Sequence, residues 1–206
     1  MEQQFDSSKF YLVGNNLCVD FVNTHIRENG LPKELLKSFE DVLAWAVKAD
    51  LLELPQARVL FQNLSGRPKA AQVFNRALKF REVLREMIFD SARGAAIQPA
   101  AIEMINLIMK EENGYTEIVR LEGGFEKRFH ANFNEPGRLL APIAEAAADL
   151  LCYGNLAYLK KCENPECVLY FYDVTKNHAR RWCSMAACGN RAKAAAFYQR
   201  QNKKLN

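Results

Sequence analysis

Four cysteines near the C-terminus constrain the fold of this chain more than any other feature. They form two pairs, Cys162 with Cys167 and Cys183 with Cys188, with four residues inside each pair and fifteen between the pairs. Two thiolate pairs separated by enough chain for a hairpin can converge on one zinc ion in a tetrahedron. The sequence therefore predicts one structural zinc ion with these four cysteines as ligands.

Six cysteines could instead form three disulfides. However, residues 1–6 lack the basic and apolar regions of a secretory signal, and the chain has no run of about 18 uncharged apolar residues. We therefore expect a cytoplasmic protein without a membrane segment, whose thiols stay reduced and whose clustered cysteines bind metal. Cys18 and Cys152 lie in apolar stretches outside the cluster and are predicted to be core residues.

Charge is unevenly distributed along the 206 residues. The net charge is +4, but residues 160–206 hold ten Lys and Arg against three acids, a net +7 that leaves −3 for residues 1–159. Residues 174–206 contain no acid at all. Such a segment favours a polyanionic partner, with a solvated basic tail as the alternative.

Residues 1–159 are typical of one mainly helical domain. Apolar residues at helical spacing, a capping serine at Ser38 and several prolines predict its helices over residues 38–52, 55–64, 68–93, 99–112 and 136–159. In the helix over 99–112, Ile102, Ile105 and Leu107 are expected to lie inside. The last helix is expected to run directly into the cysteine module, because no linker separates them.

Two parts of this domain have strand character. Residues 17–22 favour strands and follow a Gly14-Asn15-Asn16 turn signal, so a short strand or extended segment in the core is predicted. Residues 115–121 and 125–133 predict a hairpin around Gly123 and Gly124, because glycine supplies the positive backbone angles of a tight turn.

Residues 160–206 predict a small zinc finger that needs its metal to fold. A strand over 168–172, a turn over 175–178 and a returning strand over 180–183 are expected between the cysteine pairs. A helix over 191–203 follows, with Ala192, Ala195, Ala196 and Phe197 on its inner side. The expected class is α+β and mainly α: a helical N-terminal domain with a small β-hairpin or strand element, then a treble-clef-like finger.

Two segments resemble known families. Residues 180–193, Arg-Arg-Trp-Cys-Ser-Met-Ala-Ala-Cys-Gly-Asn-Arg-Ala-Lys, resemble the signature of the CGNR zinc-finger family. Residues 17–24, Leu-Cys-Val-Asp-Phe-Val-Asn-Thr, resemble the opening motif of the ABATE domain that accompanies it. The resemblance implies a bacterial, stress-induced transcription regulator whose zinc finger contacts DNA.

The candidate DNA contacts are polar and basic residues of this finger. The last helix offers Asn190, Arg191, Lys193, Arg200 and Lys203 to phosphates and base edges, and the hairpin adds Arg180 and Arg181, with Lys176 and His178 beside them. The alternatives are that Gly189 allows the turn, Asn190 caps the helix and Arg191 braces the finger against the large domain. Trp182 is expected in the finger core, and His178 is not needed as a zinc ligand.

A second polar group lies in the N-terminal domain, where Asp20, Asn23, Thr24, His25 and Arg27 occupy one short stretch. These residues are candidates to line a pocket for a small-molecule effector. The alternative is that Asp20 and Asn23 cap or pin neighbouring backbone.

Three functions fit these patterns: a DNA-binding regulator whose N-terminal domain senses a ligand or dimerises, a zinc-stabilised protein-interaction module, and an RNA-binding protein. A finger this small covers little DNA alone, so a homodimer is expected for the first. The sequence has no phosphate-binding glycine loop, nucleophile elbow or His and carboxylate metal spacing, and an enzyme is not expected.

Overall fold

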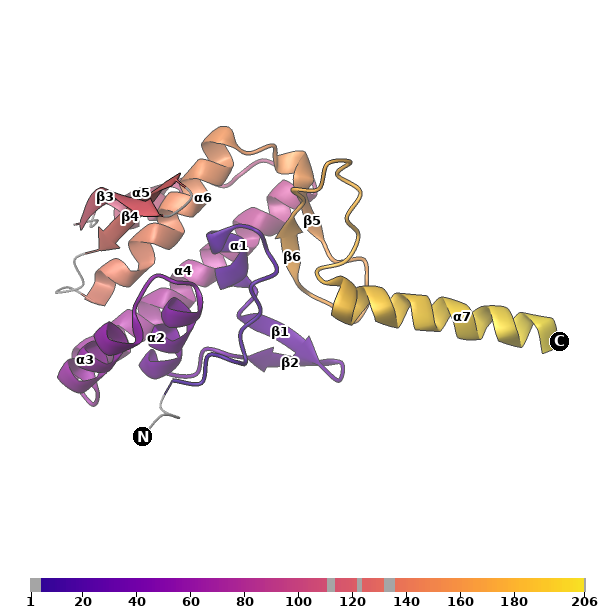
Figure 1. Ribbon diagram of the computed structural model, residues 1–206, viewed down its shortest axis with the longest axis horizontal. Coiled ribbons are helices and arrows are strands. Elements are labelled where there is room, and N and C mark those ends of the chain that lie inside the picture. The colour runs from indigo at the N-terminus through magenta and orange to yellow at the C-terminus, as the bar shows by residue number, and fades with distance from the viewer. Residues whose placement is uncertain (1–4, 111–113, 122–123, 132–135, 206) are drawn as a thin grey trace.

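The chain folds into a mainly helical body from which one long helix, α7, projects (Figure 1). The computed structural model describes residues 5–110, 114–121, 124–131 and 136–205. Within these ranges the α-helices are α1 Leu17–Val22, α2 Phe39–Lys48, α3 Leu54–Leu64, α4 Pro68–Ala92, α5 Pro99–Met109, α6 Ala141–Tyr153 and α7 Asn190–Leu205. The 3₁₀-helices are η1 Pro136–Leu140 and η2 Leu156–Tyr158, and η3 Met185–Gly189 is a π-helical turn.

The strands of the described residues form three antiparallel pairs. They are β1 His25–Glu28 with β2 Leu31–Glu34, β3 Gly114–Leu121 with β4 Gly124–Ala131, and β5 Leu159–Lys161 with β6 Tyr170–Tyr172. The small β content beside so many helices confirms the expected mainly α class.

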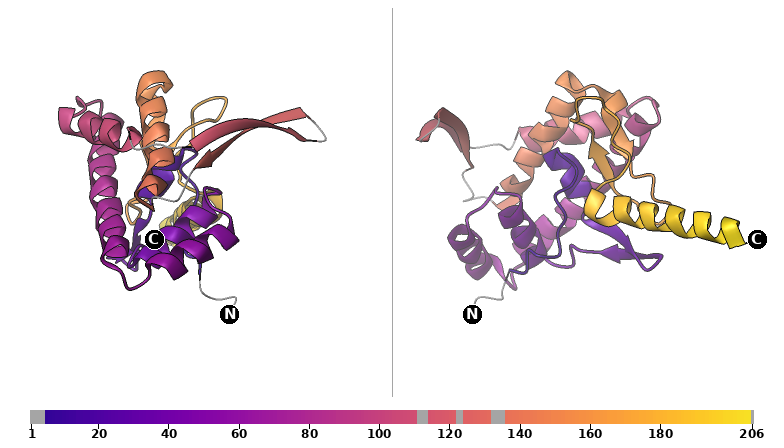
Figure 2. Two further views of the ribbon diagram at one scale, coloured as in Figure 1. Left: turned by 90° about the vertical axis from the view of Figure 1, so that its left-hand side faces the viewer. Right: turned by 45° about the vertical axis from the view of Figure 1, so that its right-hand side comes forward.

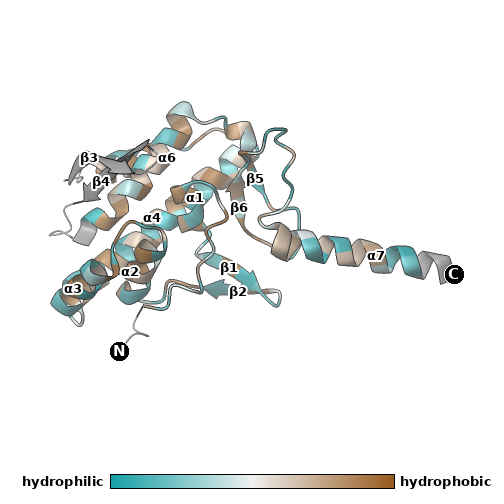
Figure 3. Ribbon diagram, in the orientation of Figure 1, coloured by the Kyte–Doolittle hydropathy of each residue, from teal (hydrophilic) through white to brown (hydrophobic). Residues whose placement is uncertain are grey.

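Helix α4 runs through the centre of the body and organises its core. Its residues Ala77, Phe80, Leu84 and Ile88 recur at helical spacing and are completely buried. Helices α1, α2 and α5 pack around it. Hydrophobic and hydrophilic residues alternate along the helices of the body (Figure 3), as expected where one side of a helix packs on the core.

The predicted helix starts are confirmed for α2 to α5. The Ser38 hydroxyl caps α2 by accepting the Asp41 N–H at 3.3 Å. Proline lies in the first turn of α3, α4 and α5. The N–H groups of a first turn have no acceptor within the helix, so proline costs no hydrogen bond there. The prediction for the inner face of α5 was wrong in part. Ile105 is buried, but Ile102 and Leu107 are exposed because α5 packs through one face only.

The segment over residues 17–22 was predicted as a strand and is the helix α1. The Asn16 side chain explains the difference, because its oxygen accepts the N–H groups of Cys18 and Val19 and thereby caps the first turn. The expectation that this segment packs into the core is confirmed, since Phe21 contacts Trp45 of α2 edge-on at 4.9 Å. Tertiary packing and one cap outweigh strand propensity here.

The predicted hairpin is present as β3 and β4, which pair from Gly114 opposite Ala131 to Leu121 opposite Gly124. In the left view of Figure 2 it extends away from the helical body. The predicted turn residue Gly123, and residues 132–133 of the predicted second strand, lie outside the described residues.

The helix predicted over residues 136–159 is shorter in the structure. It begins as η1, continues as α6 and ends at Gly154, whose backbone is extended. A Cβ atom at Gly154 would lie 2.5 Å from the Leu150 carbonyl oxygen, so only glycine permits this exit. The prediction that this helix runs straight into Cys162 was therefore wrong. The segment η2 and strand β5 instead connect α6 to the cysteine module.

The pairing predicted inside the cysteine module was also wrong. Strand β6 pairs with β5, with Lys160 opposite Phe171, and not with residues 180–183. This hairpin encloses the first cysteine pair and lies against α1 and α4. Leu159, Tyr170 and Phe171 belong to the same hydrophobic core as α4. The predicted parts 1–159 and 160–206 thus share one core.

The two cysteines outside the cluster differ in burial. Cys18 is completely buried as predicted, but Cys152 is exposed, so its assignment to the core was wrong. Near the C-terminal end of α6, Cys152 falls on the side of the helix that faces away from Leu150 and Ala147. Among the described residues, every helix falls short of the length and apolarity that crossing a membrane requires.

Candidate metal centre and basic helix

The four predicted zinc ligands come together at the base of α7. Cys162 follows β5, and Cys167 follows a tight turn in which its N–H donates to the Asn164 carbonyl at 2.9 Å. Cys183 ends the loop after β6, and Cys188 lies in η3. The four Sγ atoms all lie within 4.8 Å of one another.

The geometry of this thiol cluster fits one tetrahedral zinc ion. Zinc–sulfur bonds of about 2.3 Å place the ligand sulfurs about 3.8 Å apart in a tetrahedron. Cys183 Sγ lies 3.7 Å from Cys167 Sγ and 3.6 Å from Cys188 Sγ. The Asn164 amide donates to Cys188 Sγ at 3.3 Å, which supports a metal-bound thiolate. Four thiol ligands fill the site, so it is a structural centre for a single zinc ion.

The thiols need a cation to ionise together. Hydrogen bonds from Cys167 and Cys183 lower the pKa of Cys162 to about 2. The same contacts with Cys162 raise the pKa of Cys167 to about 12 and strongly raise the pKa of Cys183. One thiolate therefore suppresses the ionisation of its neighbours, and a divalent cation is what allows four thiolates to coexist.

A network of polar contacts, in place of the predicted returning strand, shapes the loop between β6 and Cys183. Its centre is Asp173, which is fully buried. The carboxylate accepts Lys160 Nζ at 2.8 Å, the Arg180 N–H at 2.9 Å and the Thr175 N–H at 3.0 Å. Burial raises the pKa of Asp173, but these hydrogen bonds outweigh it and hold the pKa well below its usual value. Asp173 is the last acid before the acid-free stretch of residues 174–206, and this position in the sequence could have identified it as a partner for the basic residues around it.

His178 and Lys176 lie on this loop. The turn predicted there is confirmed, because the His178 N–H donates to the Thr175 carbonyl at 3.0 Å. The His178 ring stacks on Tyr158 with centroids 3.5 Å apart, and its Nδ1 lies 2.9 Å from the Asp173 carbonyl oxygen. Packing of the loop therefore uses this imidazole, while Lys176 is exposed.

Arg180, a predicted DNA contact, points into the protein. Its guanidinium donates to the carbonyls of Val13 at 2.7 Å and Trp182 at 3.0 Å, and also to the Cys183 carbonyl. It lies 4.1 Å above the centre of the Phe171 ring. Arg180 thus joins the N-terminal segment, the loop and the second cysteine pair, and its donors are occupied within the chain.

Arg181, the neighbouring candidate, points to the surface with 62% of its side chain exposed. It pairs with Glu163 at 2.6 Å and covers the Trp182 ring at 5.1 Å. Trp182 is half-buried and packs against the core, in line with its expected place in the finger. Of these adjacent arginines, Arg180 is therefore half-buried with its guanidinium engaged by backbone carbonyls, whereas Arg181 is exposed.

Helix α7 carries the remaining candidates. Arg191, Lys193 and Arg200 are exposed, and the Lys203 side chain lies outside the described residues. The predicted inner side was wrong, because Ala195, Ala196 and Phe197 are exposed and Ala192 is only half-buried. The body covers little of this helix, which projects freely in both figures (Figures 1 and 2).

The turn into α7 uses Gly189 and Asn190. A Cβ atom at Gly189 would lie 2.6 Å from the Met185 sulfur, so glycine leaves room for the Met185 side chain. The exposed Asn190 amide donates to the Ala186 carbonyl at 3.3 Å and fastens the start of the helix. Arg191 has no hydrogen bond or ion pair with any other described residue.

The polar group of the N-terminal domain separates into two parts. Asp20 accepts the Gly14 N–H at 2.7 Å, and the Thr24 hydroxyl donates to the Phe21 carbonyl at 2.7 Å. These two side chains are buried and pin local backbone. His25 and Arg27 lie on β1, and Arg27 is exposed.

Asn23 joins the N-terminal domain to the β5–β6 hairpin of the cysteine module. Its amide donates to the Tyr170 carbonyl at 2.9 Å, and its oxygen accepts the Tyr170 N–H at 3.0 Å. The side chain is buried, so both bonds are sheltered from water. Asn23 thereby extends the β5–β6 hairpin like a strand. Asn23 was expected, as one alternative, to bind neighbouring backbone. The backbone that it binds belongs to a residue 147 positions away, which no local pattern in the sequence predicts.

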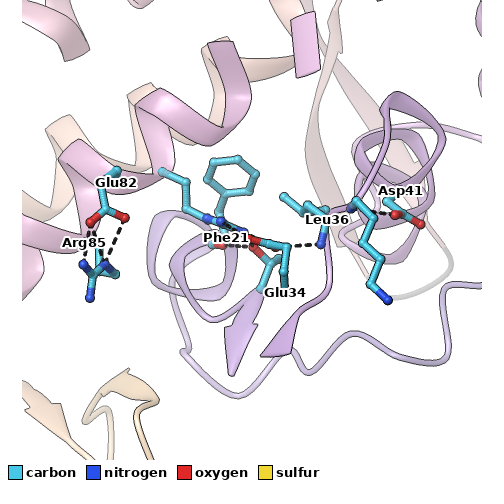
Figure 4. Close-up of polar contacts among 9 residues, drawn as sticks. Phe21, Glu34, Leu36, Asp41, Glu82 and Arg85 are labelled. Atoms are coloured by element: carbon cyan, nitrogen blue, oxygen red, sulfur yellow. Dashed lines mark hydrogen bonds and ion pairs between the residues drawn. The ribbon is translucent and has the colours of Figure 1, made fainter. Parts of the chain in front are cut away.

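An ion pair that sequence reasoning missed fixes the β1–β2 hairpin on α4. The buried Arg81 guanidinium contacts both Glu34 oxygens, at 2.7 and 2.5 Å, and also the Thr24 hydroxyl at 2.8 Å. Glu34 further accepts the Leu36 N–H at 2.8 Å (Figure 4). The bidentate geometry orients the hairpin firmly.

Asp20 gives the fold a specific dependence on pH. Burial raises the pKa of Asp20 to about 6, although the Gly14 N–H opposes this shift. The folded chain therefore holds this proton more tightly than the unfolded chain, and the resulting stability is lost as the pH rises from about 4 to 6. We expect Asp20→Asn to gain about 1 kcal/mol relative to the parent chain between pH 5 and pH 7.5.

Urea unfolding of the zinc-loaded protein at both pH values measures this difference. Asp149→Asn, at an exposed position on α6, is the control and should change stability equally at both. An Asp20→Asn effect that is the same at pH 5 and 7.5 would refute the assigned role of burial.

Comparison with known families divides the chain between residues 154 and 158. Residues 15–154 match ABATE, described as "Putative stress-induced transcription regulator". Residues 158–201 match the CGNR zinc finger. No curated protein matches the chain.

Proposed function

Because the chain belongs to the ABATE family and ends in a CGNR zinc finger, we propose that it is a transcription regulator that binds DNA through α7. The observation that carries this proposal is the exposed, acid-free helix that starts directly at the zinc site. The proposed role is binding rather than catalysis, because the zinc site has no position left for a substrate.

Helix α7 has the dimensions and charge for a nucleic-acid groove. Its 16 residues span about 24 Å, and the major groove of duplex DNA is about 12 Å wide and admits one helix. Arg191 and Arg200 are available for phosphates or guanine edges, Asn190 for adenine, and Lys193 for phosphates. Because residues 174–206 contain no acid, α7 itself carries no charge that repels the polyanion.

The zinc site would serve this function as a brace. Cys188 lies two residues before Asn190, so the metal fixes the first turn of α7. Arg180 and Asn23 tie the same module to the N-terminal domain. A helix that is rigidly mounted at one end delivers its side chains at a defined angle, which sequence-specific recognition needs.

A second candidate function, single-stranded RNA binding, is favoured by two aromatic residues of α7. Phe197 and Tyr198 are 51% and 66% exposed, with ring centroids 5.8 Å apart. Exposed aromatic rings stack on the unpaired bases of single strands. Competition between duplex DNA and single-stranded RNA for the zinc-loaded protein separates the two functions.

We expect Arg191→Gln with Arg200→Gln to weaken duplex binding at least tenfold at low salt. The slope of the logarithm of affinity against the logarithm of salt concentration should fall by about 2, because each lost phosphate contact lowers it by about 1. Fluorescence anisotropy with duplexes selected from a random pool measures both quantities.

The matched control is Arg58→Gln with Arg67→Gln, which removes the same charge from exposed positions near α3. This control should bind as the parent chain does. An equal loss in both double variants would show that net charge, and not α7, determines binding.

A further inference from the structure

A cavity of about 560 Å³ lies between the N-terminal domain and the zinc finger. One wall comes from the N-terminal segment and from the β1–β2 hairpin, which lies beside the start of α7 (Figures 1 and 2). The opposite wall comes from both cysteine pairs and from Arg191 in the first turn of α7. Its volume is within the usual range for small-molecule sites, about 300–1,000 Å³.

The cavity has an apolar lining with a few charged groups at its edge. Its apolar lining residues include Tyr11, Val13, Ile26, Val168 and Leu169. Such a lining, with few polar groups, is typical of sites that enclose the apolar body of an organic ligand.

The unpaired charges that line the cavity favour an anion. Glu28 is held by Lys33 at 2.8 Å, whereas Arg27, Arg191 and Glu166 also line the cavity and have no ion pair with any described residue. Both arginines line the cavity beside Glu166, and a guanidinium without an ion pair matches a carboxylate, sulfonate or phosphate.

Arg180 is the arginine that contacts the second cysteine pair directly, since its guanidinium donates to the Cys183 carbonyl. Arg27 and Arg191 have no hydrogen bond or ion pair with a described residue, so both are available to a ligand.

We propose that this cavity binds a small amphipathic anion, with an apolar body against Val168 and Leu169 and its charged group between Arg27 and Arg191. Because the walls come from both segments and from the base of α7, occupancy changes the affinity for DNA. This regulatory part rests on the function proposed above. A ligand shifts binding at another site only through contacts that differ between two states, and a junction cavity supplies such contacts.

The probe for the site is 1-anilinonaphthalene-8-sulfonate, which combines an apolar body with one anionic group. Its fluorescence is titrated with zinc-loaded, full-length protein, and zinc content is measured in every variant. The parent chain should bind one probe molecule per chain. Arg27→Gln should weaken this binding about tenfold. Ala187 is an exposed residue of the cavity wall, so Ala187→Phe places a large side chain in the cavity and should abolish binding.

Arg200→Gln is the matched control, since it lies on α7 away from the cavity. Arg200→Gln should bind the probe as the parent chain does but bind DNA more weakly. Arg27→Gln should bind the probe more weakly but bind DNA as the parent chain does. Equal probe affinity in the parent chain and in Ala187→Phe would overturn the site.

The regulatory part is tested by DNA affinity with and without saturating probe. A change of threefold or more that is absent in Ala187→Phe supports it, and an unchanged affinity overturns it. Failure of the parent chain to bind any duplex overturns the proposed function and its regulation, while the probe titration still decides whether the site exists.

Discussion

Replacement of Cys183 by serine is expected to abolish stoichiometric zinc binding and to unfold residues from β5 to α7. Cys183 is the sulfur that lies 3.7 and 3.6 Å from two other ligands, and its own N–H donates to Cys162 Sγ at 3.4 Å. Zinc binding contributes about 10–16 kcal/mol to the folding of small zinc modules. Because the ligands share a core with α4, the melting temperature of the whole chain should fall as well.

Zinc per chain, hydrogen exchange of β5 and β6, and duplex affinity measure this loss. Cys152→Ser is the matched control, because Cys152 is exposed and outside the cluster. It should retain one zinc ion and the parental melting temperature. Full zinc content in Cys183→Ser would refute the assignment of this ligand.

The same site predicts release of zinc in acid. Metal binding requires all four thiolates, so protons compete with the metal as the pH falls. This effect opposes that of Asp20, whose contribution grows toward low pH. Loss of the zinc module should dominate at acid pH, because it involves the larger free energy.

The features that sequence predicted well are those that one short segment determines. Proline at a helix start fixes backbone geometry locally, and paired cysteines converge because a structural zinc ion is almost always bound by a tetrahedron of ligands. The helices α3 and α4 and the metal centre follow from such local or chemical constraints. Residue types and their spacing are therefore enough to predict them.

The wrong predictions share a different origin. Residues 17–22 favour a strand, but the Asn16 cap and the packing of this segment against α4 make them a helix. Residues 180–183 resemble a strand, but β6 finds its partner in β5, and the loop is organised around Asp173. Non-local contacts determine the secondary structure of both segments, and the spacing of apolar residues in the sequence does not reveal such contacts.

The candidate DNA surface shows this limit most clearly in the pair Arg180 and Arg181. The two residues are identical in type and adjacent, so composition and charge cannot distinguish them. The structure turns one inward to three backbone carbonyls and the other outward to water. An arginine-rich string therefore predicts a basic surface but not which of its members form it.

This difference leads to a sharp expectation for two matched variants. Arg180→Gln should lower the free energy of unfolding of the zinc-loaded protein by about 3 kcal/mol, because glutamine cannot satisfy the carbonyls of Val13, Trp182 and Cys183 together. Arg181→Gln should leave the free energy of unfolding nearly unchanged, since its pair with Glu163 is exposed to solvent.

Urea unfolding measures both changes, and anisotropy under conditions where both variants are folded measures their duplex affinity. Arg181→Gln should weaken DNA binding modestly and lower the salt slope by about 1, as loss of one phosphate contact does. Arg180→Gln, once folded, should keep the parental salt slope, because its guanidinium is engaged by three backbone carbonyls of the chain itself. The opposite assignment, with Arg181 needed for stability and Arg180 for the salt slope, would mean that the loop between β6 and Cys183 adopts another conformation.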